Sequence, residues 1–204
     1  QGGTPLFPPL SLTVAPGVIV TLMGPSGIGK STLLDFIGGH LTPDFRGEGA
    51  VILNGRDLGR TPAEGRQIGI LFQDALLFPH LSVGANLAFG LTPAVRGRAA
   101  RRAAVAEALD QAGLSGFQNR DPATLSGGQR ARVALMRTLL AQPEALLLDE
   151  PFGKLDALLR EGMRRFVLDH ARQRGLPVLL VTHDPSDAHA AGGRIVSLGA
   201  TDAR

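Results

Sequence analysis

Short runs of apolar residues recur along the chain, and each of them predicts a strand of a buried sheet. The runs occupy residues 18–23, 68–72, 145–148 and 178–181. Continuous apolar runs of this length are typical of parallel strands that are covered on both faces. Residues 10–14 instead alternate apolar and polar side chains, which predicts a half-exposed strand.

Helical patterns separate these strands. We expect helices over residues 31–37, 128–141 and 155–174, each next to one of the apolar runs. Residues 50–53 predict a further short strand that enters a turn at Asn54-Gly55. The alternation of strands and helices predicts an α/β fold with a mostly parallel, doubly wound sheet and an antiparallel β portion toward the N-terminus. In such folds ligands bind at the carboxyl ends of the strands.

The pattern changes between residues 74 and 129. Ala-rich segments that carry Arg and Glu have helical spacing there, and Val105 and Leu109 fall on one face of a helix that begins near Arg98. We expect this region to be a helical subdomain inserted into a single domain that spans residues 1–204.

A glycine-rich stretch between the first strand and its helix fits the pattern G-x-x-x-x-G-K-[ST], the phosphate-binding loop of a P-loop NTPase core. The glycines let successive backbone N–H groups turn toward an anion, and the helix N-terminus adds its positive end. Lys30 can reach the β- and γ-phosphates of a nucleotide, and the Ser31 hydroxyl can bind Mg²⁺. The predicted nucleotide-binding residues of the loop are Gly24, Pro25, Ser26, Gly27, Ile28, Gly29, Lys30, Ser31 and Thr32.

Four polar residues follow the other apolar runs. Asp149 and Glu150 come directly after one of them, and Gln73 and His183 follow two more. Asp149 can hold Mg²⁺ through its water shell, and Glu150 can accept a proton from the water that attacks the γ-phosphate. His183 can donate a hydrogen bond to that phosphate, and the amide of Gln73 suits Mg²⁺ or the water. We therefore expect Lys30, Gln73, Glu150 and His183 to act in catalysis, and Ser31, Gln73 and Asp149 to hold the metal.

A second glycine-rich stretch, residues 125–129, precedes the helix at 128–141. Its backbone N–H groups predict another anion cradle, formed by Ser126, Gly127, Gly128 and Gln129. One triphosphate does not need two cradles within one chain. A dimer does, because each cradle can cap the nucleotide that the other subunit binds.

The composition narrows the classes of partner. Basic residues exceed acidic ones by only 21 to 18, so we expect no nucleic-acid binding. The densest basic run, residues 96–102, predicts a solvated helix face. The chain has no cysteine, which excludes disulfides and Cys-bound zinc. No apolar run approaches the roughly 20 residues that span a bilayer.

Taken together, these motifs resemble the nucleotide-binding subunit of an ABC transporter over residues 10–198. The resemblance comprises the Walker A loop (24–32), the Q-loop Gln73, the LSGGQ signature (125–129), Walker B (146–149), the catalytic Glu150, a D-loop at Leu155-Asp156 and the switch His183. It implies ATP and Mg²⁺ as cofactors and a homodimer that closes on two ATP molecules and opens after hydrolysis. Ser126, Gly127 and Gly128 would then touch the γ-phosphate that is bound to the partner's Lys30.

Residues 72–80 and 148–152 are similar to those of bacterial importers of the thiamine, iron(III) and polyamine type. This resemblance implies integral membrane permease subunits that contact residues 74–81, a periplasmic substrate-binding protein and a peripheral location on the cytoplasmic face of the inner membrane.

Three positions depart from the family pattern. The residue that stacks on adenine is usually Tyr or Trp, which the chain lacks, so Phe7 or a residue upstream of Gln1 must take this role. Lys154 stands in the D-loop where a small residue is commoner. We also expect no C-terminal regulatory domain after residue 198.

Two other functions fit parts of the sequence. A soluble ABC ATPase of DNA repair, ribosome function or cofactor assembly would share the motifs, but DNA-repair members carry coiled-coil arms or Cys-bound zinc and ribosome-acting members carry two cassettes. A small-molecule kinase would share the phosphate loop but has no use for LSGGQ.

Overall fold

The computed structural model describes residues 5–153, 155 and 157–198. The chain divides into two compact units. The first comprises Gln1–Ile70, Glu144–Glu150 and Leu168–Arg204, and the second comprises Leu71–Pro143 and Pro151–Val167.

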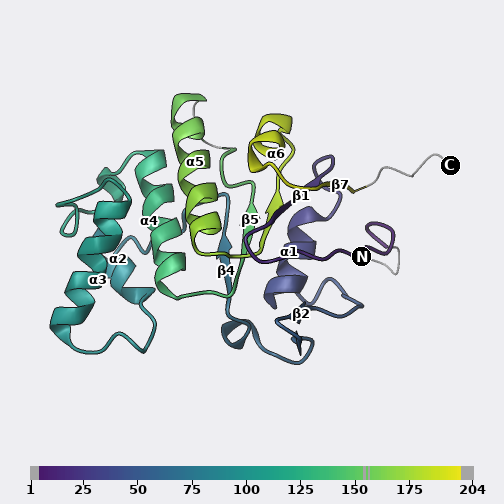
Figure 1. Cartoon of the computed structure of the whole chain (residues 1–204), viewed down its shortest axis with the longest axis horizontal. Coiled ribbons are helices and arrows are strands. Elements are labelled where there is room, and N and C mark those ends of the chain that lie inside the picture. Colours follow the sequence, from purple (N-terminus) through teal and green to yellow (C-terminus); the bar gives the residue numbers. More distant parts are fainter. Residues whose placement is uncertain (1–4, 154, 156, 199–204) are drawn as a thin grey trace. The chain divides into compact units, whose positions relative to one another are not determined.

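A five-stranded sheet forms the centre of the first unit, with the order β4-β5-β6-β1-β7 (Figure 1). Its strands are β1 (Ile19–Met23), β4 (Ile68–Leu71), β5 (Ala145–Asp149), β6 (Val178–Val181) and β7 (Ile195–Ser197). β6 pairs in parallel with both β5 and β1, and β1 pairs in parallel with β7. The four apolar runs therefore form strands of a sheet that is parallel at these three pairings, as predicted.

The register of the sheet aligns the ends of three strands. Leu22 of β1 lies opposite Val181 of β6, and Val181 lies opposite Asp149 of β5. Since parallel strands run in one direction, the segments that follow β1, β5 and β6 leave the sheet at the same edge.

The core of the first unit is a cluster of branched aliphatic side chains from three strands and one helix. Its buried members are Val20, Leu22, Leu34, Leu147, Leu179 and Val181. The predicted strand at residues 10–14 is wrong, because the structure assigns no strand there. Its alternating side chains still pack on the core through Leu10, Leu12 and Val14. The alternating apolar and polar residues correctly indicated that one side of residues 10–14 packs on the core. Among the described residues, however, no neighbouring strand forms a hydrogen-bonded ladder with this segment.

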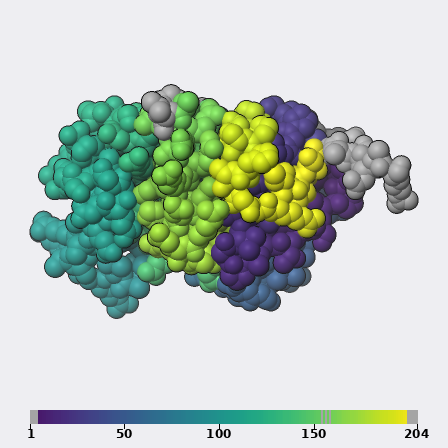
Figure 2. Space-filling view, turned by 45° about the horizontal axis from the view of Figure 1, so that its top comes forward, coloured from purple at the N-terminus to yellow at the C-terminus, as the bar shows by residue number. Residues whose placement is uncertain are grey.

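The helices of the first unit are α1 (Lys30–Gly38), α6 (Pro185–Ala191) and the last part of α5 (Ala157–Gln173). A small antiparallel hairpin joins β2 (Ile52–Leu53) to β3 (Arg56–Asp57) through the predicted Asn54-Gly55 turn, and a short 3₁₀ helix covers Ala63–Gly65. In the space-filling view the yellow residues of α6 and β7 lie against the purple N-terminal residues, as the pairing of β7 with β1 requires (Figure 2).

Arg66 caps the C-terminal end of α1. The side chain is only 7% exposed, and its Nη1 donates to the carbonyls of Phe36 (2.9 Å) and Ile37 (2.7 Å). Its Nε donates to the carbonyl of Thr61 (2.8 Å). Carbonyls in the last turn of a helix have no partner within the helix, and a cation there also complements the helix dipole.

The second unit is helical. It contains α2 (Val83–Phe89), α3 (Arg98–Gln111), the 3₁₀ helix Pro122–Thr124, α4 (Gly127–Leu140) and the first part of α5. Helices α2, α3 and α4 pack on one another through fully buried residues such as Leu87, Leu109 and Leu135 (Figure 1). In the part of the chain that the structure describes, no helix is both long and apolar enough to pass through a bilayer.

Three short elements were not predicted from the sequence. Helices α2 and α6 each have seven residues and β7 has three, so hydrophobic periodicity has too few turns to identify them. Local signals were present for α6: Asp184 at the N-cap, Pro185 in the first turn and Gly192 at the C-cap with φ 68°.

Two glycines fix β7 against β1. A Cβ at Gly193 would lie 1.7 Å from the carbonyl oxygen of Ile19, and one at Gly24 would lie 2.8 Å from that of Leu198. The amide of Leu198 in turn donates to the carbonyl of Met23 at 2.7 Å. The segment that follows β7 therefore touches the start of the phosphate loop.

We expect Gly193→Ala to destabilise the protein strongly, because the methyl group cannot fit unless β7 separates from β1. The loss should be on the order of 2 kcal/mol or more in the free energy of unfolding, measured by urea denaturation. Gly162→Ala is the matched control. Gly162 lies within α5 and a Cβ there meets nothing closer than 3.9 Å, so its replacement should stabilise by about 0.5–1 kcal/mol. Equal effects of the two changes would contradict the close packing at Gly193.

Candidate active site

The phosphate loop connects β1 to α1 and holds the Lys30 ammonium within its curve. Lys30 is only 7% exposed, and its Nζ donates to the carbonyls of Gly24 (2.8 Å) and Pro25 (3.0 Å). Gly27 and Gly29 adopt φ values of 82° and 97°, which a residue with a side chain rarely tolerates. The loop thus combines a fixed cation with the positive end of α1.

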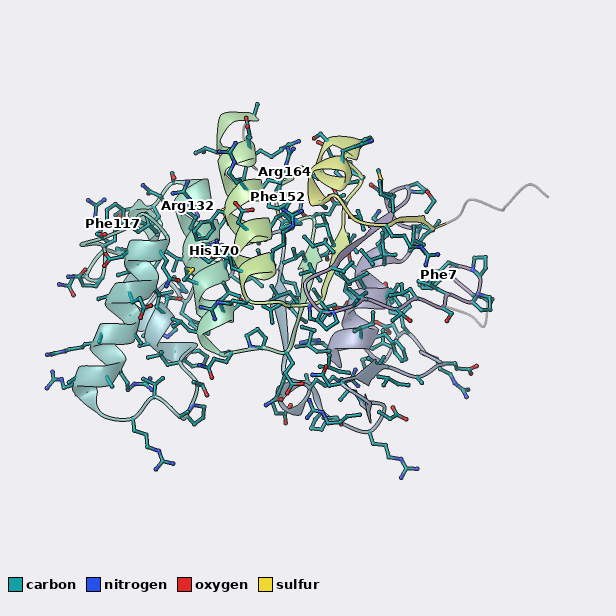
Figure 3. The ribbon with its side chains drawn as sticks, viewed as in Figure 1. Phe7, Phe117, Arg132, Phe152, Arg164 and His170 are labelled. Carbon is teal, nitrogen blue, oxygen red and sulfur yellow. The ribbon has the colours of Figure 1, made fainter. Side chains whose placement is uncertain are left out.

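The N-terminal segment lies against this loop. A Cβ on Gly29 would meet the side chain of Leu6 at 2.9 Å and the ring of Phe7 at 3.3 Å. Figure 3 shows Phe7 on this segment, at the side of the first unit that carries α1. The structure therefore brings an aromatic ring next to the loop, where the sequence predicts one for the base of a nucleotide.

Asp149 lies at the end of β5 within reach of the loop. Burial raises the pKa of its carboxyl group above the usual value. The neighbouring carboxylates of Glu150 and Asp35 act in the same direction, whereas the Ser31 hydroxyl and the Lys30 ammonium oppose it. Its Oδ1 is buried and has no hydrogen-bond partner among the described residues. A buried carboxylate oxygen without a donor fits a bound cation, and Mg²⁺ is usually held by one or two protein oxygens together with substrate phosphates.

Glu150 and His183 form a direct pair. The Nδ1 atom of His183 lies 2.9 Å from Oε1 and 2.8 Å from Oε2 of Glu150. Because a carboxylate only accepts, the Nδ1–H of the imidazole donates. His183 can then donate to a phosphate only through an Nε2–H, which requires the imidazolium form. The carboxylate keeps lone pairs that can accept a proton from water.

Glu150 has a left-handed backbone, with φ 46°. Its amide continues the ladder of the sheet by donating to the carbonyl of Val181 at 3.0 Å. A positive φ costs a residue with a Cβ roughly 1 kcal/mol, and such conformations occur most often at functional sites. This backbone turns the chain immediately after β5, at the edge where the phosphate loop also begins.

The remaining predicted residues belong to the second unit. Gln73 is exposed beyond the end of β4. The LSGGQ stretch forms the N-terminus of α4, where the Ser126 hydroxyl accepts from the Gln129 amide and the Gln129 side chain accepts from the Ser126 amide. This reciprocal capping box leaves Gly127 exposed at the helix start. In the D-loop, Leu155 is buried, whereas Lys154 and Asp156 lie outside the described residues.

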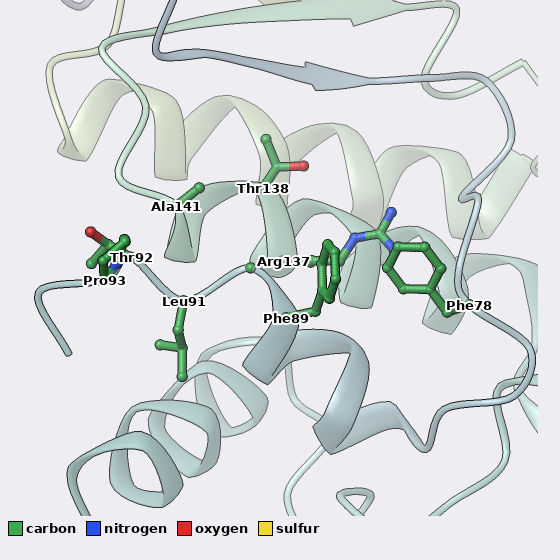
Figure 4. A pocket seen from close by; sticks show the side chains of 9 residues that line it. Phe78, Phe89, Leu91, Thr92, Pro93, Arg137, Thr138 and Ala141 are labelled. Carbon is green, nitrogen blue, oxygen red and sulfur yellow. The ribbon is translucent and has the colours of Figure 1, made fainter. Parts of the chain in front are cut away.

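A second feature, which the sequence reading did not identify, is a pocket of about 590 Å³ in the second unit. It is lined by Phe78, Phe89, Gly90, Leu91, Thr92, Pro93, Arg137, Thr138 and Ala141. We call it the helical-unit groove. The rings of Phe78 and Phe89 meet edge to face, with centroids 4.7 Å apart (Figure 4). Phe89 is 69% exposed, which is unusual for an aromatic side chain.

Arg137 of α4 supports the groove. Its guanidinium lies 5.1 Å from the centre of the Phe78 ring and donates to the carbonyls of Leu76 (3.1 Å) and Ala75 (3.4 Å). Burial lowers the pKa of this guanidinium from its usual value. The fully buried Asn86 of α2 adds a second support: its Oδ1 accepts from the Phe78 amide at 2.8 Å and its Nδ2 donates to the Phe78 carbonyl at 3.1 Å. The available signals were the position of Arg137 between apolar residues 133–136 and 139–140, and that of Asn86 as the one polar side chain of residues 83–89.

A parallel α/β sheet with a phosphate loop after one strand and acidic residues after another defines a P-loop nucleoside triphosphatase. Comparison with known proteins identifies the family within this class. The family model described as "ABC transporter" matches residues 7–153. The chain therefore belongs to the ABC transporter family, as a member of its ATP-binding and ATP-hydrolysing component.

Several relatives cover most of the chain. It is 54% identical over 181 residues to the uncharacterized ABC transporter ATP-binding protein YnjD of Escherichia coli (strain K12), which spans 89% of this chain and 83% of the relative. It is 46% identical over 184 residues to the thiamine import ATP-binding protein ThiQ of Cereibacter sphaeroides, over 90% of this chain and 78% of the relative. The Fe(3+) ions import ATP-binding protein FbpC of Agrobacterium fabrum is 41% identical over 195 residues, over 96% of this chain and 54% of the relative.

A solved structure shares the fold. The dimeric, post-hydrolysis state of the ATP-binding cassette MJ0796 bound to ADP and Pi superposes with a TM-score of 0.78 at 33% sequence identity. The match covers 92% of this chain and 83% of that one.

We expect Asp149→Asn to raise the melting temperature of the nucleotide-free protein at neutral pH, although it should impair turnover. The raised pKa means that the folded state disfavours the carboxylate, so wild-type stability falls as pH rises through the folded-state pKa of Asp149. The neutral amide avoids this cost. The gain should be roughly 1–3 °C at pH 7, should shrink as pH falls and should vanish near pH 3, below the ordinary Asp pKa of 3.8, where Asp149 is protonated in both states. Thermal unfolding between about pH 3 and pH 8 measures it, with the exposed Asp44→Asn as control. A gain that does not depend on pH would contradict the assignment.

Proposed function

We propose that the chain is the energy-coupling subunit of an ABC importer, which hydrolyses ATP as a dimer beneath separate membrane subunits. The observation that carries the proposal is the Glu150–His183 pair at the edge of the sheet that also bears the phosphate loop. The names of the relatives support import, because two of the three name an imported solute, thiamine or iron(III). A soluble ABC ATPase is the disfavoured alternative.

In this proposal the phosphate loop binds the triphosphate. The phosphates face the backbone N–H groups around Gly27 and Gly29 and the N-terminus of α1. The Lys30 ammonium then donates its hydrogen bonds to the β- and γ-phosphates in place of the loop carbonyls. Phe7 stacks on the adenine, since its ring already lies beside Gly29.

The side chains of Ser31, Asp149 and Gln73 are proposed to hold Mg²⁺. The buried, unpartnered Oδ1 of Asp149 is the feature of the structure that fits a cation. When bound, Mg²⁺ neutralises charge on the phosphate oxygens. It would also lower the pKa that burial raises at Asp149, because a nearby cation favours the carboxylate.

Hydrolysis then needs positioning and one proton acceptor. Water attacks the γ-phosphorus, the bond to the bridging oxygen of ADP breaks, and the Glu150 carboxylate takes the proton of the water. His183 orients that carboxylate through its Nδ1–H and donates its other N–H to the γ-phosphate. Gln73 positions the water or the metal.

We propose that two copies of the chain share the work. Ser126, Gly127, Gly128 and Gln129 of one copy contact the γ-phosphate that the partner's Lys30 holds. The capping box supports this assignment, because it leaves the first amides of α4 directed out of the helix. The dimeric ADP-bound relative supports it further.

The helical-unit groove is the proposed docking site for the permease. It combines the exposed ring of Phe89 with Phe78, which belongs to the segment after Gln73, residues 74–81, that the family resemblance assigns to the membrane partner. The subunit would be peripheral on the cytoplasmic face of the inner membrane, with a periplasmic substrate-binding protein on the other side. Residues 74–129 would form the inserted helical subdomain of one ATPase domain.

We expect Glu150→Gln to slow ATP hydrolysis by about 10²–10⁴-fold while ATP binding persists, because it removes only the proton acceptor. The variant should also form a stable dimer with Mg-ATP, detected by light scattering. Phosphate release and fluorescent-nucleotide binding measure the two effects. Asp44→Asn serves as control at an exposed acid. Turnover within tenfold of the wild type would remove Glu150 from the base role.

We expect Phe89→Asp to release the subunit from membranes that contain the proposed permease, because a charged carboxylate replaces the exposed apolar ring that the proposed contact would bury. Because Phe89 is exposed, the loss in unfolding free energy should stay close to the contribution of its edge-to-face contact with Phe78, about 0.5–1.5 kcal/mol. Ile52→Asp is the matched control, since Ile52 is 67% exposed, belongs to the first unit and does not line the groove. Membrane fractionation measures both. Equal membrane retention of the two variants would exclude the groove.

A further inference from the structure

Three exposed arginines mark the start of α3. Arg98 and Arg102 are four residues apart and therefore lie on one side of the helix, and Arg96 precedes it. We call these three residues the α3 basic patch. The sequence has no Asp or Glu between Asp74 and Glu107. None of the ion pairs within the described residues involves an arginine of the patch.

The stability of α3 does not account for these arginines. The helix has no acidic residue in its first turn and no basic residue in its last, and its acids, Glu107 and Asp110, lie toward the C-terminal end. The helix dipole favours acidic residues at the N-terminal end and basic residues at the C-terminal end, and the charges of α3 have the opposite arrangement. Side chains that oppose the local preference without compensation commonly serve a function.

A fourth arginine places the patch beside the helical-unit groove. Arg101 is partly buried, and its Nη2 donates to the carbonyl of Ala88 at 2.7 Å, near the end of α2. Phe89, the next residue, lines the groove, as does the segment through Pro93. The start of α3 is thereby fixed at the rim of the groove, and the patch continues the surface proposed for the permease.

We propose that the α3 basic patch binds anionic phospholipid headgroups of the leaflet that surrounds the permease. The inference rests on the proposed function for the nearness of a membrane. Charge complementarity selects the occupant: arginine suits phosphate oxygens, and three separate guanidinium groups over seven residues match a surface of many headgroups better than a single anion. The patch adds electrostatic attraction to the membrane, whereas the groove provides the specific contacts with the permease.

The test uses the full chain and vesicles, with no permease and no nucleotide. The wild type should float with phosphatidylglycerol–phosphatidylcholine vesicles in low salt. It should not float with pure phosphatidylcholine vesicles, and high salt should release it, because exposed charges are screened. The partition coefficient should fall by about tenfold or more in the patch variant, which combines Arg96→Gln, Arg98→Gln and Arg102→Gln. The reason is that each arginine near an anionic surface adds to the free energy of membrane binding.

A charge-matched variant provides the control. Arg46→Gln, Arg60→Gln and Arg194→Gln remove three exposed arginines from the first unit and change the net charge equally. This variant should bind vesicles like the wild type. Circular dichroism checks folding, and the patch variant should melt no lower than the wild type because its arginines oppose the α3 dipole.

Three outcomes would overturn the proposal. They are no flotation of the wild type with anionic vesicles, equal losses in the two variants, and vesicle binding by the patch variant that equals that of the wild type. The last would exclude the patch as a lipid-binding surface. Absence of ATP hydrolysis by the wild type would refute the proposed function separately, because vesicle binding is measured without nucleotide.

Discussion

The candidate active site depends on one constraint of the parallel sheet, the common edge at which β1, β5 and β6 end. The register aligns Leu22, Val181 and Asp149 across these strands, so the phosphate loop, the acidic pair and His183 leave the sheet together. Each segment comes from a different part of the sequence, and hydrogen bonds between strands bring them within reach. A carboxylate and an imidazole separated by 33 positions in the chain then meet at 2.8 Å. The left-handed turn at Glu150 is part of the same constraint, because the chain must change direction directly after β5.

Helix α4 has a comparable position in the second unit. Its N-terminus carries the glycines proposed to face a partner's nucleotide, and Arg137, ten residues later and about 15 Å along the axis, holds the segment that lines the helical-unit groove. A rigid helix with a nucleotide contact at one end and a groove contact at the other suits an energy-coupling subunit. The capping box ties the residue before α4 to the first turn of the helix, and the buried Asn86 binds the backbone of Phe78.

Features with long or specific sequence patterns could be predicted from the sequence alone. Apolar runs identified four of the five strands of the sheet, all but β7, and the Asn54-Gly55 pair identified the hairpin. The prediction failed at residues 10–14, where alternation reports a packed face and says nothing about a hydrogen-bonded neighbour. The candidate residues that follow β1, β4, β5 and β6 could be named from the sequence because each group follows an apolar run, and residues 125–129 could be named from their glycine pattern. The contact of His183 with Glu150, the unpartnered Oδ1 of Asp149 and the support of Phe78 by Arg137 could not be predicted, since they depend on side-chain geometry in three dimensions.

The closeness of the N-terminal segment to the phosphate loop has a practical consequence. Phe7 touches the region of Gly29, and the chain contains no tryptophan or tyrosine. An indole introduced at position 7 would be the sole strong near-ultraviolet chromophore of the protein and would lie against its most important loop. Its emission would report on that loop without background from any other side chain, so the molecule is naturally suited to fluorescence spectroscopy with a single genetically encoded probe.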